Sequence, residues 1–207
     1  MLKILKSLLV ILSVGTIATS ATNAYFFNIK KSINNTFTAG TLELNLSGIS
    51  SNTGIFNVEK MAPGDTKTGT WTLKNTGTID GFLELQGVSV QNKELGCEAA
   101  EGGGVDLTCG DPGGGEGELQ NVTNLLLFVD ADNDGVFDGG ERLIYNGVTG
   151  SASSMNQDLN IPFAADEQTY ITAIFTWPPH AGSDDNVAQG DWMDFWVNFE
   201  LAQTEAM

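Results

Sequence analysis

The stretch Met193-Asp194-Phe195-Trp196-Val197-Asn198-Phe199-Glu200-Leu201 decides the fold class of this chain. Large apolar side chains occupy every second position, and most of the positions between them are polar. Successive side chains of a β-strand point to opposite faces, so this alternation is typical of a strand with one buried face. A helix repeats every 3.6 residues and would scatter these apolar side chains around its surface.

The same alternation recurs in several segments that precede this stretch. It is found in segments 42–46, 71–74, 83–85 and 170–177, and no segment after residue 24 has a convincing helical period. Many short strands joined by turns predict an all-β fold, a jelly-roll-like antiparallel β-sandwich. The turn signals between them are Pro63-Gly64-Asp65, Asn75-Thr76-Gly77, Asn146-Gly147 and Pro178-Pro179.

The N-terminus has the layout of a cleavable export signal. Lys3 and Lys6 precede an apolar run over residues 8–17, and small residues end at Thr22-Asn23-Ala24. We expect signal peptidase to cut after Ala24. A membrane anchor is the alternative, but the run is shorter than the roughly 20 residues of a spanning helix. A type IV pilin signal would need a long apolar helix after the cut. The protein is therefore expected outside the cell, secreted or at the cell surface.

Length and charge limit the classes of function. Removing 24 residues from 207 leaves 183 residues, enough for a single domain. The full chain carries −17, and the signal holds two lysines and no acid, so the mature part is near −19. This balance argues against nucleic-acid partners and favours divalent cations. We expect a domain over 37–207, with a Gly-rich insertion at 96–117, preceded by a strand and linker at 25–36.

Export would free an apolar strand at the new N-terminus. Its side chains alternate between two faces. The edges of a sandwich can accept another strand. The segment can therefore fold back into its own domain or enter a neighbouring subunit, and the residues alone leave both possibilities open. One face carries Tyr25, Phe27 and Ile29, and the other carries Phe26 and Asn28.

The two cysteines, Cys97 and Cys109, both lie in the Gly-rich insertion. A disulfide is plausible in an exported protein. Closing so short a loop contributes roughly 3 kcal/mol in the chain-entropy model. We therefore predict a Cys97–Cys109 disulfide rather than a metal site.

The sharpest chemical motif is the twelve-residue segment from Asp130 to Glu141. Acids stand at positions 1, 3, 5, 9 and 12, and Gly135 stands at position 6, where a sharp turn is needed. This is the ligand pattern of an EF-hand loop and predicts a Ca²⁺ site. The flanks read as strands, so we expect a structural ion on a β-hairpin, and an acidic turn facing water is the alternative. The expected ligands are Asp130, Asp132, Asp134, Val136 (through its carbonyl), Asp138 and Glu141.

Other signals are weak. Asn34, Asn45 and Asn121 begin N-glycosylation acceptor patterns. His180 is the only histidine, and the chain contains neither G-x-S-x-G nor H-E-x-x-H. Nothing in these patterns marks a catalytic residue or a small-molecule substrate.

Three blocks in order resemble the TasA/camelysin family of exported fibre proteins, which includes archaeal bundling pilins. They are Phe26 to Leu44, Met61 to Gly77, and Gln189 to Gln203. The resemblance implies a jelly-roll subunit of a biofilm matrix fibre or bundling pilus. It also implies a homopolymer joined by the donor strand Tyr25, Phe26, Phe27, Asn28 and Ile29.

The expected function is therefore a structural subunit of an extracellular filament, without enzyme activity. Two alternatives remain open. Camelysin carries the name of a metalloprotease, and a monomeric calcium-binding surface or matrix protein would keep its own first strand.

Overall fold

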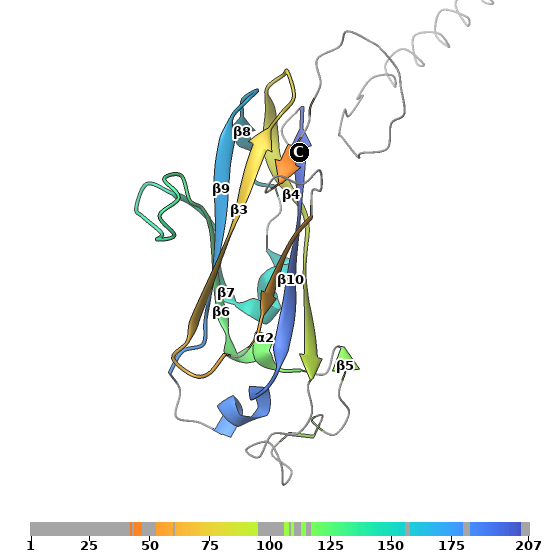
Figure 1. Ribbon diagram of the computed structural model, residues 1–207, viewed down its shortest axis with the longest axis vertical. Helices are drawn as coiled ribbons and strands as arrows, with labels where there is room; N and C mark the ends of the chain where they lie inside the picture. The colour runs from red at the N-terminus through yellow and green to blue at the C-terminus, as the bar shows by residue number, and fades with distance from the viewer. Residues whose placement is uncertain are drawn as a thin grey trace, which may run out of the picture.

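A computed structural model describes residues 42, 44–46, 53–59, 61–94, 106–107, 109, 113–114, 117–155, 158–179 and 183–203. The expected signal peptide, the donor strand, Asn34, Cys97 and His180 lie outside these residues. Within them the chain forms two antiparallel sheets packed face to face, which confirms the predicted all-β sandwich (Figure 1).

The first sheet has the order β1-β3-β9-β6-β7, and the second has the order β2-β10-β4-β5, with β8 also paired to β4. Every strand pair is antiparallel. The first sheet comprises β1 (Leu44–Leu46), β3 (Thr66–Asn75), β9 (Gln168–Thr176), β6 (Asn124–Val129) and β7 (Arg142–Val148). The second comprises β2 (Thr53–Val58), β10 (Trp192–Ala202), β4 (Gly81–Glu94), β5 (Gly113–Gly114) and β8 (Ile161–Phe163).

Among the described residues, helical structure is confined to three short helices of four to six residues. These are α2 (Leu119–Val122), η1 (Thr149–Ser154) and η2 (Ser183–Ala188). Helices α2 and η2 lie near one end of the sandwich, the lower end in Figure 1. Within the described residues, no helix has both the length and the apolar character required to cross a bilayer.

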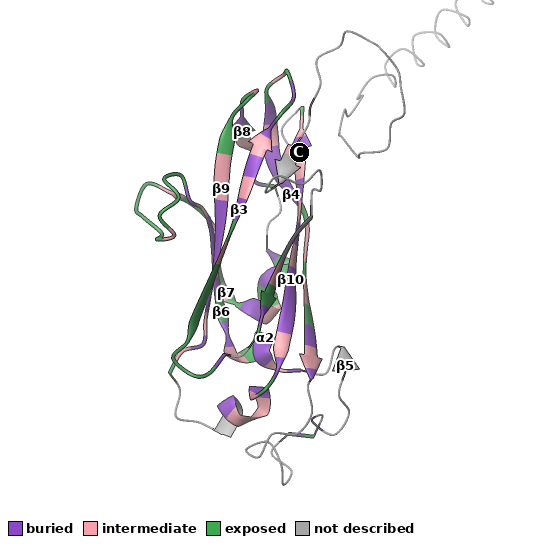
Figure 2. Cartoon of the chain, in the orientation of Figure 1, coloured by how far each residue is buried: buried purple, intermediate pink, exposed green. Residues whose placement is uncertain are grey.

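Strand β10 supplies the centre of the core, as its alternation predicts. Met193, Phe195, Val197, Phe199 and Leu201 are all buried, and Figure 2 shows buried residues recurring along the strand. Burying each side chain of this size contributes roughly 1.5–3 kcal/mol relative to leaving it exposed.

Aromatic pairs join the two sheets. The ring of Trp71 on β3 lies 6.0 Å from that of Phe199 and 6.2 Å from that of Phe195. Phe175 on β9 contacts Phe195 edge to face at 5.2 Å and stacks on Phe56 of β2 at 5.5 Å. The buried rings of Trp71, Phe175, Phe195 and Phe199 therefore form the aromatic centre of the core.

One predicted turn is wrong. Asn146 and Gly147 lie inside β7, where they pair with Leu126 and Leu125 of β6. A Cβ on Gly147 would lie 3.0 Å from the hydroxyl oxygen of Tyr145, so glycine here makes room for that side chain. Pairing with β6 outweighs the local turn preference of the dipeptide.

The chain changes sheets between β1 and β2. Strand β1 pairs with β3 only at Leu73–Asn75, and β2 then pairs with β10 in the other sheet. Strand β3 pairs with β9 on its other side over the whole of Thr66–Lys74. Among the described residues, therefore, Thr66–Thr72 has a partner strand on one side only.

Candidate functional site

The Asp130–Glu141 loop joins β6 to β7 and projects from the side of the sandwich (Figure 1). Both of its flanks are strands, as predicted, so the loop closes a β-hairpin rather than a helix pair. Gly135 has a φ of 76°, and Asn133 has a φ of 59°. Glycine and asparagine are the residues that tolerate this left-handed backbone best. The loop therefore makes its sharp turn where the motif requires one.

The first loop residue, Asp130, is fully buried. Its Oδ1 accepts a hydrogen bond from the backbone N–H of Asp134 at 3.1 Å. Its Oδ2 accepts one from the N–H of Gly135 at 3.1 Å and one from the hydroxyl of Thr172 on β9 at 2.7 Å. Asp130 thus ties the loop to the centre of the first sheet.

The last loop residue, Glu141, holds the two ends of the loop together. Its Oε1 accepts a hydrogen bond from the N–H of Ala131 at 2.8 Å, and its Oε2 accepts one from the N–H of Asp138 at 3.0 Å. A carboxylate in this place can turn both oxygens toward a cation at the loop centre.

The structure brings the predicted acidic ligands together in two overlapping groups. Ligand oxygens of Asp130, Asp132 and Glu141 lie within 4.8 Å of one another, and so do those of Asp132, Asp134 and Asp138. The shared residue is Asp132. Desolvation by surrounding groups, together with the negative charges of Asp134, Glu141 and Asp130, raises the pKa of Asp132.

An apolar contact also anchors the loop. The ring of Phe137, at position 8 of the loop, lies 5.3 Å from the ring of Phe128 in an edge-on arrangement. Phe128 belongs to β6 and is fully buried, whereas Phe137 is 36% exposed. The loop is therefore held at its first residue, at its last residue and at this aromatic pair.

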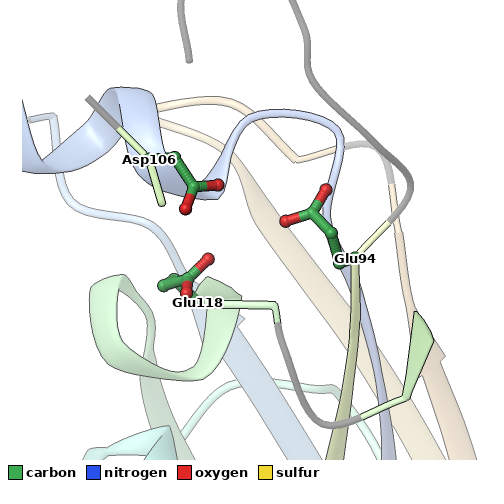
Figure 3. A group of neighbouring side chains, drawn as sticks. All are labelled: Glu94, Asp106 and Glu118. Atoms are coloured by element: carbon green, nitrogen blue, oxygen red, sulfur yellow. The ribbon is translucent and has the colours of Figure 1, made fainter. Parts of the chain in front are cut away.

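A second group of acids lies at the end of the sandwich that carries α2. Glu94 ends β4, Asp106 belongs to the Gly-rich insertion, and Glu118 immediately precedes α2. Figure 3 shows their carboxylates pointing toward a common space, and their ligand oxygens lie within 4.8 Å of one another. Glu94 is 2% exposed and Asp106 is 8% exposed.

Such a group of like charges is unfavourable unless something offsets it. Two unit charges 4.8 Å apart repel by about 3 kcal/mol at an effective dielectric constant of ~20. More negative charge lies nearby, since Asp191 is buried and accepts a hydrogen bond from the N–H of Glu118. A divalent cation or bound protons would remove this repulsion.

This second group has no counterpart in the sequence predictions. Its members are separated by 12 residues each, from 94 to 106 and from 106 to 118, and match no ligand spacing. The one signal was indirect: the insertion that carries Asp106 is flanked by Glu94 and Glu118.

The remaining predicted site residues are dispersed. Cys109 is buried and disulfide-bonded, while Cys97 lies outside the described residues, so their pairing stays a prediction. Asn45 belongs to β1, and Asn121 is exposed on α2. Use of either asparagine for glycosylation stays a prediction. None of these residues belongs to either acidic group.

The fold and the two acidic groups define an all-β sandwich with carboxylate sites suited to hard cations. A family model described as camelysin metallo-endopeptidase matches residues 7–94, which is less than half of the chain. This match confirms the resemblance to the TasA/camelysin family over the N-terminal part. No curated protein matches the chain.

The family match corrects one prediction. We expected a protein without enzyme activity, and the family description names a metallo-endopeptidase instead. The matched segment ends at Glu94. The Asp130–Glu141 loop and two acids of the second group, Asp106 and Glu118, therefore lie beyond it.

The carboxylate side chains of the two acidic groups suit hard divalent cations. Both acidic groups offer carboxylate oxygens, the donors preferred by Ca²⁺, Mg²⁺ and Mn²⁺. Zn²⁺ in proteins favours histidine and cysteine. In the described part of the chain, the only cysteine, Cys109, is in a disulfide, and no histidine is present.

Proposed function

We propose that this protein is an exported structural subunit of an extracellular filament, and that subunits join by donating the N-terminal strand to a neighbour. The family match and the β-sandwich support this assignment at the level of the family and the fold. The apolar segment Tyr25–Ile29, placed after an export signal, supplies the strand to be donated.

The observation that carries the proposal is the one-sided pairing of β3. Between Thr66 and Thr72, β3 has a partner in β9, and its opposite side carries no strand among the described residues. Backbone groups along such a sheet edge are ready to pair with a further strand.

The core-facing side of the Thr66–Thr72 edge is only partly shielded from solvent. Gly69 faces Phe56, whose nearest ring atom lies 2.1 Å from the position that a Cβ on Gly69 would take. Both residues are half-buried, although Phe56 packs against the core cluster. Apolar side chains of an added strand can therefore gain burial here.

The decisive experiment replaces one apolar residue of the donor strand. In the mature protein, Phe27→Asp places a charge on the face that carries Tyr25 and Ile29. We expect this variant to stay a folded monomer and to form no filaments in negative-stain electron microscopy. Burial of an unpaired carboxylate in the acceptor would oppose insertion.

The matched control is Asn28→Asp, which adds the same charge on the opposite face of the strand. We expect it to form filaments like the unaltered protein. Normal filaments from Phe27→Asp, or from a chain that lacks Tyr25–Ile29, would contradict strand donation.

We further propose that the Asp130–Glu141 loop binds a structural Ca²⁺. The ligand spacing, the left-handed Gly135 and the convergence of the acids support this role. The ion would offset the mutual repulsion of the loop carboxylates and rigidify the β6–β7 hairpin.

The family description favours a second candidate function, a metal-dependent endopeptidase. A casein assay on the purified mature protein tests it, with chelation and then readdition of Ca²⁺, Mn²⁺ or Zn²⁺. Hydrolysis that chelation abolishes and one of these metals restores would support it. No hydrolysis with any of the three would overturn it.

A further inference from the structure

The buried acids Glu94 and Asp106, together with the half-buried Glu118, suggest a metal site separate from the Asp130–Glu141 loop. The three residues come from the end of β4, the Gly-rich insertion and the start of α2. Their carboxylates converge on one space (Figure 3), with ligand oxygens within 4.8 Å of one another. A cation placed there would contact three separate segments at once.

An independent observation is provided by Asn92. This side chain is 4% exposed, and its Oδ1 accepts no hydrogen bond among the described residues. Asn92 and Glu94 are two residues apart on β4, so their side chains lie on the same face of the strand. A buried amide oxygen that lacks a donor is costly, and an amide oxygen is a common ligand of Ca²⁺.

The lysine between these two residues does not neutralise the charge of the acidic group. Lys93 lies on the opposite face of β4, where its Nζ is 2.7 Å from Asp194 Oδ2. The same Nζ lies 3.8 Å from the centre of the Trp192 ring. This cation is thus engaged on the other side of the sheet.

We propose that Glu94, Asp106 and Glu118, together with the amide oxygen of Asn92, bind a divalent cation, Ca²⁺ by preference, that fastens the Gly-rich insertion to the end of the sandwich. The oxygen-only ligand set selects a hard cation. The insertion is also attached beside the site through β5, which pairs with Lys93 and Glu94.

The test uses the full mature chain with the loop site disabled by Asp132→Asn and Glu141→Gln. After chelator dialysis, the protein is titrated with Ca²⁺ in a calorimeter, and bound metal is counted by mass spectrometry. We expect a folded protein, by circular dichroism, that retains a single Ca²⁺. A folded loop-disabled chain that binds neither Ca²⁺, Mg²⁺ nor Mn²⁺ would overturn the proposal.

Asp106→Asn in the same background identifies the ligand. We expect the affinity of the retained ion to fall by about tenfold or more. The control is Asp166→Asn, which makes the same chemical change at an exposed residue whose φ of 62° asparagine tolerates. Unchanged affinity in Asp106→Asn would contradict the assignment.

Limited proteolysis of the loop-disabled chain gives a readout that needs no substitution at the buried site. We expect saturating Ca²⁺ to slow cleavage within residues 96–117 by about tenfold, because cleavage requires local opening of the fastened insertion. An unchanged cleavage rate would overturn the fastening role. None of these measurements depends on filament formation.

Discussion

The hydroxyl of Thr172 donates a 2.7 Å hydrogen bond to Oδ2 of Asp130, and both residues are fully buried. Through this bond, the centre of the first sheet orients the first carboxylate of the calcium-type loop. Thr70 lies on the other side, with its hydroxyl oxygen 2.8 Å from that of Thr172. Since Thr172 donates its proton to Asp130, Thr70 is the donor in the second bond.

These two hydrogen bonds predict that valine substitutions at Thr172 and Thr70 differ in the size of their effects. Thr172→Val removes the bond to Asp130, and we expect it to cost about 1–2 kcal/mol of unfolding free energy and to weaken Ca²⁺ binding. Thr70→Val removes only the outer bond, and its effects should be smaller in both respects. Urea unfolding and calcium titration measure the two quantities. Equal effects of the two substitutions would contradict this arrangement of hydrogen bonds.

Removal of calcium should destabilise the protein. We expect EDTA to lower the melting temperature, because the loop carboxylates then repel one another without a counterion. Glu141→Gln should reduce this response, whereas Glu59→Gln, at an exposed residue, should leave it unchanged. Calorimetric melting curves at several Ca²⁺ concentrations provide the check. A melting temperature that EDTA does not change, with no metal in the purified protein, would refute the calcium prediction.

The aromatic core should be sensitive to truncation at its centre. Phe199→Ala removes a fully buried ring that contacts Trp71 across the sheets, and we expect a loss of about 3–5 kcal/mol. Trp196 points to the other face of β10 and is only half-buried, so Trp196→Ala should cost less. Urea denaturation of the two variants tests the ranking, and the reverse order would show that the core is organised differently.

Glu84 provides a test of pH dependence. Burial, opposed by the N–H groups of Asn160 and Leu159, raises the pKa of Glu84 above its usual 4.5. The folded state therefore binds this proton more tightly than the unfolded state, so its contribution to stability falls as the pH rises through the folded pKa. Glu84→Gln lacks this loss, so its stability relative to the unaltered protein should increase as the pH rises above 4.5.

Unfolding free energies at several pH values measure this gain. Glu59→Gln is the matched control, since it makes the same charge change at an exposed side chain. A difference between Glu84→Gln and the unaltered protein that stays constant with pH would refute the interpretation.

The sequence by itself determined the features that depend only on residues close together along the chain. Alternation along Met193–Leu201 reports a strand because the pleat repeats every two residues, and the buried core of β10 agrees with it. The acids of the Asp130–Glu141 loop converge because they share one short turn. The hairpin that carries this loop was also predicted from the sequence, because both flanking segments have the pattern of strands, and both form strands.

Only the tertiary structure decided the features that depend on distant segments. Pairing with β6 keeps Asn146 and Gly147 in a strand despite their turn preference. The path of the insertion brings Glu94, Asp106 and Glu118 together, which no spacing along the chain indicates. Local periodicity is set by the geometry of the backbone, whereas these contacts are set by sheet order and burial, which become defined only when the whole domain packs.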